Sequence, residues 1–250
     1  MRKSFLGVVF PLLIAVGLGA QDTQILLDTF KSNFKKAEEL SVKLRILQDS
    51  IKAGSHDMGS MYHLAVDYVV DNSSLLDTES LMKEIALLAV QQVKEAGYDA
   101  AKYSLWRLFR NNSDTTLRVS ILNSLGVIAQ RDSRIIKGII EWLSSQNFML
   151  GGKTNPDNQV VAEAVKTLGT LKDSSAFHAL FTTMELKYSK QITSLAKQAL
   201  LSLEGELKAN LMGVIRNGTI SDKVAALRMV VQNDKLEDNH KAEAAELALE

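Results

Sequence analysis

The feature that most constrains the fold is a helical unit that recurs about five times from roughly residue 78 to the end of the chain. Its clearest copy spans 158–180, where an apolar stripe at helical spacing ends in Leu168-Gly169-Thr-Leu171 and Asp173 precedes a second apolar stretch. A unit of this length cannot bury its apolar stripe alone, so neighbouring units must stack on one another. The repeat therefore predicts an all-α array of helix pairs, which typically works as a surface that holds a partner.

The composition favours helices with short connections. The 250 residues include two prolines and 14 glycines, fewer turn residues than a sandwich or barrel of short strands needs. Aromatic residues make up only 6% of the chain, so Ala, Leu, Val and Ile must build the core. The formal net charge is zero and no long basic run is present, which argues against a nucleic-acid partner.

Residues 1–20 resemble a secretory signal peptide. Arg2 and Lys3 precede an apolar stretch from Phe5 to Leu18, and small residues stand before Gln21. This stretch contains Pro11 and is shorter than the roughly 20 residues that span a bilayer, so we expect cleavage and no transmembrane span in the mature chain. Cleavage would leave 27 basic and 29 acidic residues, a net charge of −2. The chain has no cysteine, and an exported chain without disulfides fits the bacterial periplasm better than an animal secretion, although secretion remains the alternative.

Residues 21–77 are predicted to form N-terminal helices that pack on the array. A stripe from Phe30 to Ile51 predicts one long helix over 23–53, with Gly54 as the residue that follows its end. The same stripe would also fit a short coiled-coil seam, but packing against a neighbouring helix is the simpler interpretation. A second, shorter helix is predicted over 58–71.

The array itself is predicted to span 78–250 as about five helix pairs. Expected N-cap residues precede the first helix of each pair, at spacings of 32 to 42 residues: Thr78, Ser113, Asn155, Ser189 and Ser221. Second helices are expected over 133–146 and 175–187, and 149–157 is expected to be the one sizeable loop. Asp132 and Asp173 are expected to accept hydrogen bonds from the free amides of the helices that follow them.

These units resemble short HEAT-like repeats. The segment Ala164-Val165-x-x-Leu168-Gly169-x-Leu171-x-Asp173-x-x-Ala176-x-x-x-Leu180 fits that pattern well, and the copy around Leu125-Gly126 and Asp132 fits it less fully. The prolines of many HEAT first helices are missing, and the spacing approaches that of tetratricopeptide repeats, whose Trp and Tyr signature is absent. The resemblance implies an α-solenoid whose second helices line the concave side. We expect Gly126 and Gly169 to mark close helix contacts, because glycine inside a helix costs about 1 kcal/mol.

The residues that could carry chemistry do not form a recognisable site in the sequence. His63 and Asp67 stand four apart on a predicted helix, but no third metal ligand recurs nearby. Gly151-Gly152-Lys153-Thr154 lacks the upstream glycine of a phosphate-binding loop. We therefore expect no enzyme activity, no metal and no cofactor.

The residues best suited to binding a partner lie on the second helices. Lys102, Trp106 and Arg110 share one face of a predicted helix, and Lys137 and Glu141 stand clear of the apolar face of the next second helix. An exposed tryptophan flanked by cations is a typical anchor for a protein partner. The competing interpretation is that Trp106 and Trp142 wedge between the layers of the array.

Together these observations predict an exported, non-enzymatic scaffold that binds another protein of the cell envelope. Two alternatives remain: an accessory of a larger envelope machine, such as a flagellar motor or export apparatus, and a ligand-binding protein similar to the phycobilin lyases, which carry the same short repeat. The chain ends within an apolar helical pattern, so self-association through the C-terminal end is a further expectation.

Overall fold

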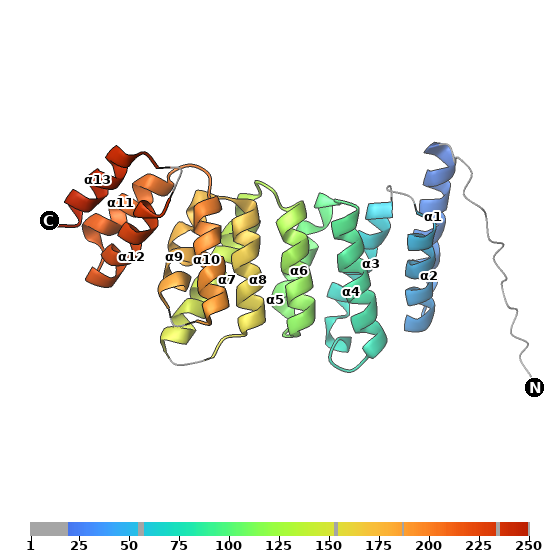
Figure 1. Cartoon of the computed structure of the whole chain (residues 1–250). Coiled ribbons are helices and arrows are strands. Elements are labelled where there is room, and N and C mark those ends of the chain that lie inside the picture. The colour runs from blue at the N-terminus through green and yellow to red at the C-terminus, as the bar shows by residue number, and fades with distance from the viewer. Residues whose placement is uncertain (1–19, 55–57, 153–154, 187, 234–235, 250) are drawn as a thin grey trace, which may run out of the picture.

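The computed structural model describes residues 20–54, 58–152, 155–186, 188–233 and 236–249. Over these residues the chain is helical and contains no strand, which confirms the all-α prediction (Figure 1). The predicted signal peptide falls almost entirely on residues outside this description. None of the described helices is long and apolar enough to cross a membrane.

Thirteen α-helices follow one another along the described chain. Their bounds are α1 Ala20–Lys36, α2 Leu40–Lys52, α3 Gly59–Asp71, α4 Ser80–Glu95, α5 Lys102–Asn111, α6 Thr115–Ile128, α7 Ser133–Gly151, α8 Asn158–Leu171, α9 Phe177–Glu185, α10 Lys190–Ser202, α11 Leu207–Asn217, α12 Ile220–Val231 and α13 Asp238–Leu247. In chain order the five predicted pairs are α4/α5, α6/α7, α8/α9, α10/α11 and α12/α13. Their predicted pairing is wrong for the first four, because the closer contacts between layers join α5 to α6, α7 to α8, α9 to α10 and α11 to α12. We call the first member of each pair a first helix and the other a second helix.

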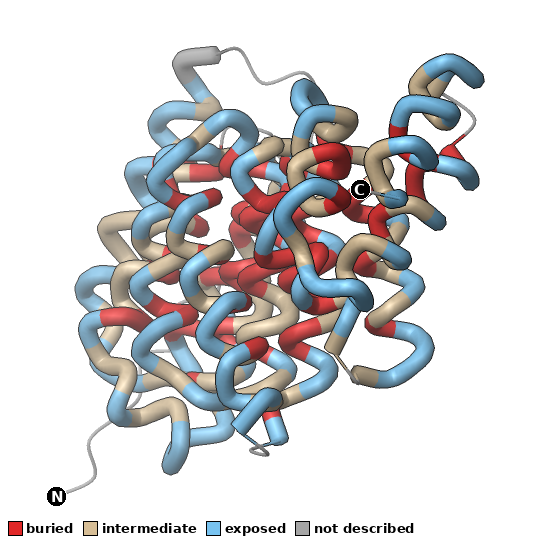
Figure 2. Tube along the Cα trace, turned by 90° about the vertical axis from the view of Figure 1, so that its left-hand side faces the viewer, coloured by how far each residue is buried: buried red, intermediate tan, exposed pale blue. Residues whose placement is uncertain are grey.

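The helices from α1 to α10 form two layers. In one layer α2 packs on α4, α4 on α6, α6 on α8 and α8 on α10; in the other, α1, α3, α5, α7 and α9 follow one another. Helices α4, α6, α8 and α10 stand side by side across the view of Figure 1. Figure 2 shows the buried residues running through the middle of the array, with exposed residues on its outer faces. Each apolar stripe is thus buried by its neighbours in both layers.

Small residues allow the first helices to approach closely. A Cβ atom added at Gly169 of α8 would lie 3.0 Å from Ala199 Cβ of α10, and one added at Gly126 of α6 would lie 3.6 Å from Thr167 of α8. At this distance the Thr167 hydroxyl on α8 donates to the Leu122 carbonyl on α6 across 3.0 Å. The expectation that both glycines mark close helix contacts is confirmed.

Aspartate side chains begin several of the helices. Asp132 and Asp173 accept hydrogen bonds from the backbone amides that follow them, as predicted. Ser189 was correctly placed as the N-cap of α10, but the other predicted caps were displaced by one or two residues. The observed N-cap residues of α4, α6, α8 and α12 are Glu79, Asp114, Asp157 and Thr219. At the start of α6, the carboxylate of Asp114, one residue after the predicted Ser113, accepts the hydrogen bond from the Leu117 amide. At the start of α12, the Thr219 side chain accepts from the Asp222 amide and the Asp222 side chain accepts from the Thr219 amide, which forms a capping box.

The single long helix predicted over 23–53 is wrong. The chain breaks at residues 37–39 into α1 and α2, and α2 packs back on α1. The Lys43 ammonium donates to the Phe34 carbonyl at 2.6 Å, which satisfies an acceptor in the last turn of α1. The apolar stripe from Phe30 to Ile51 is continuous in sequence, but folding it into a hairpin lets both halves pack against the array. Gly54 does follow the end of α2 with a positive φ of 68°, as predicted.

The predicted loop at 149–157 is shorter than expected, because α7 continues to Gly151. The side chain of Asn147 holds this last part of the helix: its amide donates to the Ala179 carbonyl of α9 at 3.0 Å, and its oxygen accepts from Thr183 at 3.1 Å. The second helix expected over 175–187 is also shorter, since α9 begins at Phe177 after a short 3-10 turn.

The last three helices form a cluster of their own. Helices α11, α12 and α13 pack on one another more closely than any of them packs on α9 or α10. The residues of α10 that correspond to Leu122 and Gly126 of α6 are Lys197 and Leu201. A leucine thus stands where glycine lets α6 and α8 approach closely.

Candidate partner-binding surface

Two of the predicted binding residues, Lys102 and Trp106, are engaged inside the fold. The Lys102 ammonium lies 3.2 Å from an Asp132 carboxylate oxygen, and this bond raises the pKa of Lys102. The Trp106 ring stacks on Phe109 at 5.0 Å between centroids and covers Gly138 of α7, where an added Cβ would come within 2.7 Å of the indole. The structure thus favours the interpretation of Trp106 as a wedge between second helices.

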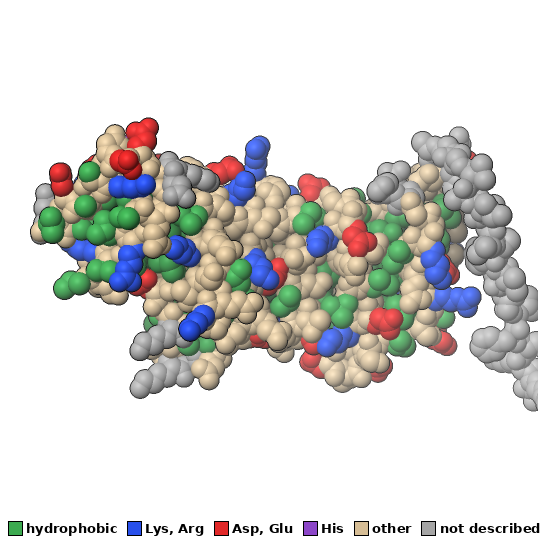
Figure 3. Space-filling model, viewed as in Figure 1, with side chains coloured by type: hydrophobic (Ala, Val, Ile, Leu, Met, Phe, Trp, Pro, Cys, Tyr) green, Lys and Arg blue, Asp and Glu red, His purple; other side chains and the backbone are tan. Residues whose placement is uncertain are grey.

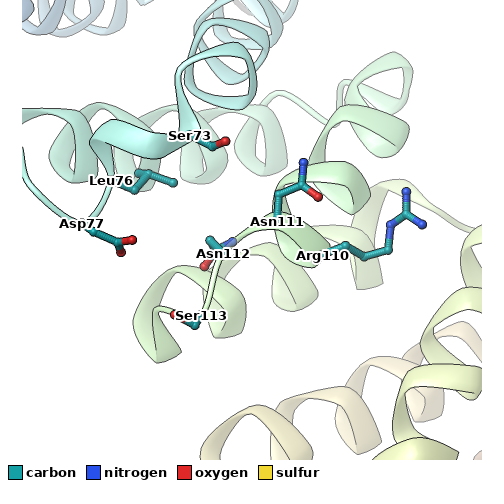
Figure 4. Close-up of a pocket in the computed structure, with 7 residues that line it drawn as sticks. All are labelled: Ser73, Leu76, Asp77, Arg110, Asn111, Asn112 and Ser113. Atoms are coloured by element: carbon teal, nitrogen blue, oxygen red, sulfur yellow. The ribbon is translucent and has the colours of Figure 1, made fainter.

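Arg110 is exposed and lines a shallow hollow of about 290 Å³. Figure 4 shows Leu76 and Asp77 on one side of this hollow and Asn111 and Asn112 on the other, with the Arg110 side chain leading away from Asp77. The Asn112 amide donates to the Leu108 carbonyl and so belongs to the end of α5. The hollow is a polar seam between the end of α5 and the turn before α4.

Lys137 and Glu141 are exposed on α7. Their charged groups lie 3.8 Å apart, with 77% and 67% of the side chains accessible. An exposed ion pair of this kind contributes little to stability, so both side chains remain available to a partner. Of the five predicted residues, only Arg110, Lys137 and Glu141 therefore present free surface.

A second hollow lies on the opposite layer, across three successive first helices. It has a volume of about 200 Å³, and its lining residues are Lys94 of α4, Asn123, Gly126 and Val127 of α6, and Glu163, Lys166, Thr167 and Thr170 of α8. We call it the first-helix groove. The close approach of α6 and α8 at Gly126 and Thr167 sets its floor. Val127, 45% exposed, adds an apolar contact among the polar groups.

Polar side chains connect the three helices along this groove. The Lys94 ammonium on α4 donates to Asn123 Oδ1 on α6, and the Asn123 amide donates to Glu163 Oε1 on α8 at 3.0 Å. Glu163 is only 7% exposed, and Lys166 lies 3.2 Å from its second oxygen. A buried carboxylate is tolerated here because both of its oxygens have donors. These bonds hold the side chains of Lys94, Asn123 and Lys166 at fixed positions along the groove.

Sequence reasoning missed this groove. Asn123, Glu163 and Lys166 are polar residues on amphipathic helices, and polar residues at such positions usually face solvent. The pattern along one helix does not show which polar residues meet those of the next helix. Glycine at corresponding positions of α6 and α8 was the available signal, because it indicated where the two helices come closest.

The histidine and carboxylate that could have bound a metal serve a different contact. His63 Nε2 lies 3.1 Å from Ser104 Oγ and 3.5 Å from Asp67 Oδ2, while the Ser104 hydroxyl donates to Asp67 Oδ1 at 2.6 Å. Serine, histidine and aspartate meet, but the aspartate contacts the same imidazole nitrogen as the serine, so the relay of a catalytic triad is not formed. The cluster links α3 to α5. Within the described ranges, no three His, Cys, Asp or Glu side chains are grouped to hold a metal ion.

Comparison with known proteins adds little to this picture. No protein family and no curated protein matches the chain. A solved structure described as "Computational Design of Self-Assembling Cyclic Protein Homooligomers" is 13% identical, with 92% of this chain and 91% of that chain covered. Its TM-score of 0.20 is too low for an argument about this chain.

Proposed function

We propose that this chain is an exported, non-enzymatic scaffold, an α-solenoid of HEAT-like pairs that binds another protein in the bacterial periplasm through the first-helix groove. The alternating packing of first and second helices supports the solenoid. Aspartate caps also recur at Asp114 and Asp157 before the first helices and at Asp132 and Asp173 before the second helices, as expected of one repeated unit.

The observation that carries the proposed function is that the groove is lined by three successive first helices. A partner lying across it would contact residues from three repeats at once, which a single helix pair cannot offer. Lys94 and Lys166 supply cations and Val127 an apolar contact, while the buried Glu163 holds Asn123 and Lys166 in place. This mixture suits a protein segment with both polar and apolar side chains.

The closer packing of the first helices supports this side as the inner one. In a curved two-layer array, helices on the inside of the bend must lie closer together than those on the outside. The contact between α6 and α8 is made at a glycine, Gly126, which allows a close approach. The contact between α5 and α7 is filled by the bulky rings of Trp106, Phe109 and Trp142. We therefore propose the first-helix face, rather than the second-helix face of the family pattern, as the concave binding surface.

A crosslinking pull-down from the envelope fraction of the native host tests the proposal. A groove variant, Val127→Asp with Thr170→Glu, is compared with a matched variant of the other face, Lys137→Glu with Glu141→Lys. All four side chains are exposed, so both variants should keep the helical circular dichroism of the parent. We expect a discrete partner that is lost with the groove variant and retained by the other.

The opposite pattern would move the partner to the second helices and overturn the groove proposal. Recovery of no discrete partner by the parent chain would overturn the scaffold proposal itself. If the chain is exported, cell fractionation should find it in the periplasm without residues 1–20. A chain found in the cytoplasm with residues 1–20 still attached would contradict export.

A further inference from the structure

Helix α12 carries an apolar stripe that is largely exposed among the described residues. Ile220, Val224 and Val231 are 83%, 43% and 53% exposed, and Leu227 between them is half-buried. Residues at this spacing share one face of a helix. Figure 3 shows hydrophobic side chains gathered over α11–α13, with basic and acidic side chains among them.

The position of this stripe identifies it as the face that receives another helix. Gly126 and Gly169 are the twelfth residues of α6 and α8, and each faces the next first helix. The eighth residue of α6 is Leu122, whose carbonyl accepts the hydrogen bond from α8. The eighth and twelfth residues of α12 are Leu227 and Val231. The stripe thus occupies the positions by which earlier first helices contact their successors.

Helix α13 shows the same property in the other layer. Trp106 and Phe109, the fifth and eighth residues of α5, contact Gly138 and Trp142 of α7. The corresponding residues of α13 are Ala242 and Ala245, and both are exposed. Leu249, one turn further, is 89% exposed. Helices α12 and α13 together therefore present one apolar face, which we call the C-terminal end face.

The opposite end of the array does not match this face. The tenth residues of α8 and α10, Thr167 and Ala199, receive the preceding first helix. The tenth residue of α2 is Asp49, and it pairs with Lys52 at 3.4 Å and with Arg45 at 3.9 Å. Stacking a second copy head to tail would bury these charges against the apolar stripe, which is unfavourable. The α12 stripe of a second C-terminal end face contains no charged residue.

Charge selects the way in which two such faces meet. Lys223 and Arg228 flank the stripe on α12, whereas Asp238 and Glu246 lie on the exposed side of α13. Packing α12 on the α12 of a second copy would bring cations together. Antiparallel packing of α12 on α13 of the second copy places Lys223 toward one acidic residue and Arg228 toward the other.

We infer that two copies of this chain associate through their C-terminal end faces about a two-fold axis, with α12 of each copy against α13 of the other. The contact is isologous, so it closes at two copies and does not grow into a filament. This inference does not rest on the first-helix groove or on the proposed partner.

Disulfide crosslinking provides the test, because the chain has no cysteine of its own. The double variant Val224→Cys with Ala245→Cys should form a covalent dimer under mild oxidation, and the single variant Val224→Cys should not. Both sites are exposed, so the substitutions should leave the fold intact, which circular dichroism checks. Light scattering of the parent should give the mass of two chains at concentrations of tens of micromolar or above.

A matched pair of charged substitutions locates the contact. Val231→Asp should return the mass to that of one chain, whereas Ile25→Asp at the other end, where Ile25 is 59% exposed, should leave the dimer unchanged. A parent that remains at one chain mass at every concentration would overturn the inference. So would masses that keep rising beyond two chains, which indicate head-to-tail growth, or efficient crosslinking of Val224→Cys alone, which indicates α12 against α12.

Discussion

The two glycines at corresponding positions of α6 and α8 should respond in opposite ways to alanine. Replacing a glycine inside a helix by alanine stabilises the helix by about 1 kcal/mol when there is room for the methyl group. At Gly126 the new Cβ would lie 3.6 Å from the nearest atom, Thr167 Cγ2, an ordinary van der Waals distance. We therefore expect Gly126→Ala to raise the free energy of unfolding by about 1 kcal/mol.

At Gly169 the same methyl group would meet α10. The new Cβ would lie 3.0 Å from Ala199 Cβ and 3.1 Å from Ala199 Cα, so the backbone of α10 would have to move. Overpacking of this kind costs about 1–3 kcal/mol, which offsets or exceeds the gain in helix propensity. Gly169→Ala should therefore be neutral or destabilising, and less stable than Gly126→Ala by at least about 1 kcal/mol.

Urea unfolding followed by circular dichroism and by the fluorescence of Trp106 and Trp142 measures both variants in one background. The double variant Gly169→Ala with Ala199→Gly should be more stable than the sum of the two single effects, because the second change removes one of the two opposing atoms. Equal stabilisation by Gly126→Ala and Gly169→Ala would show that the close approach of α8 and α10 does not set the stability of this contact, and would refute the reasoning.

Three further outcomes are expected. Burial alone would raise the pKa of Asp132, but hydrogen bonds from the Ile135 amide, Tyr103 and Lys102 outweigh it and lower this pKa. The carboxylate therefore stabilises the fold above the ordinary carboxyl pKa, and this stabilisation is lost as pH falls through the lowered value. In the Asp132→Asn variant, the free energy of unfolding should depend less on pH below about pH 4, as acid unfolding would show. Trp106→Ala should lower the free energy of unfolding by about 2–3 kcal/mol through lost packing on α7, whereas Lys137→Ala should change it by less than about 0.5 kcal/mol; similar effects would contradict the wedge interpretation. Lys43→Ala should lower it by about 1–3 kcal/mol in a urea titration, because a buried carbonyl of α1 loses its donor.

The sequence alone predicted the helical class and the turns at Asp132 and Asp173, but not which helices of the two layers pack most closely. These features are local: a stripe at helical spacing, a carboxylate before free amides and a glycine at a close contact each act within one or two turns of chain. The same local reasoning misplaced caps where several polar residues competed within two positions, as at Ser113 and Asp114. It also continued a helix across residues 37–39, since the apolar stripe there has no interruption.

The binding surfaces depended on contacts between repeats. On a single helix, Lys102 and Trp106 look exposed. In the structure, Lys102 pairs with Asp132 just before α7, and Trp106 packs on Gly138 of α7. Asn123 and Glu163 look like solvated polar residues until α6 and α8 lie side by side.

The sequence by itself determined which residues form helices and which face of each helix is apolar, because both follow from the period of the chain. Only the tertiary structure decided which polar residues meet across helices, and which apolar faces, such as that of Val224 and Val231, are left without a neighbour. Those outcomes depend on the distance and angle between neighbouring helices. Both are set by how side chains from separate repeats pack together.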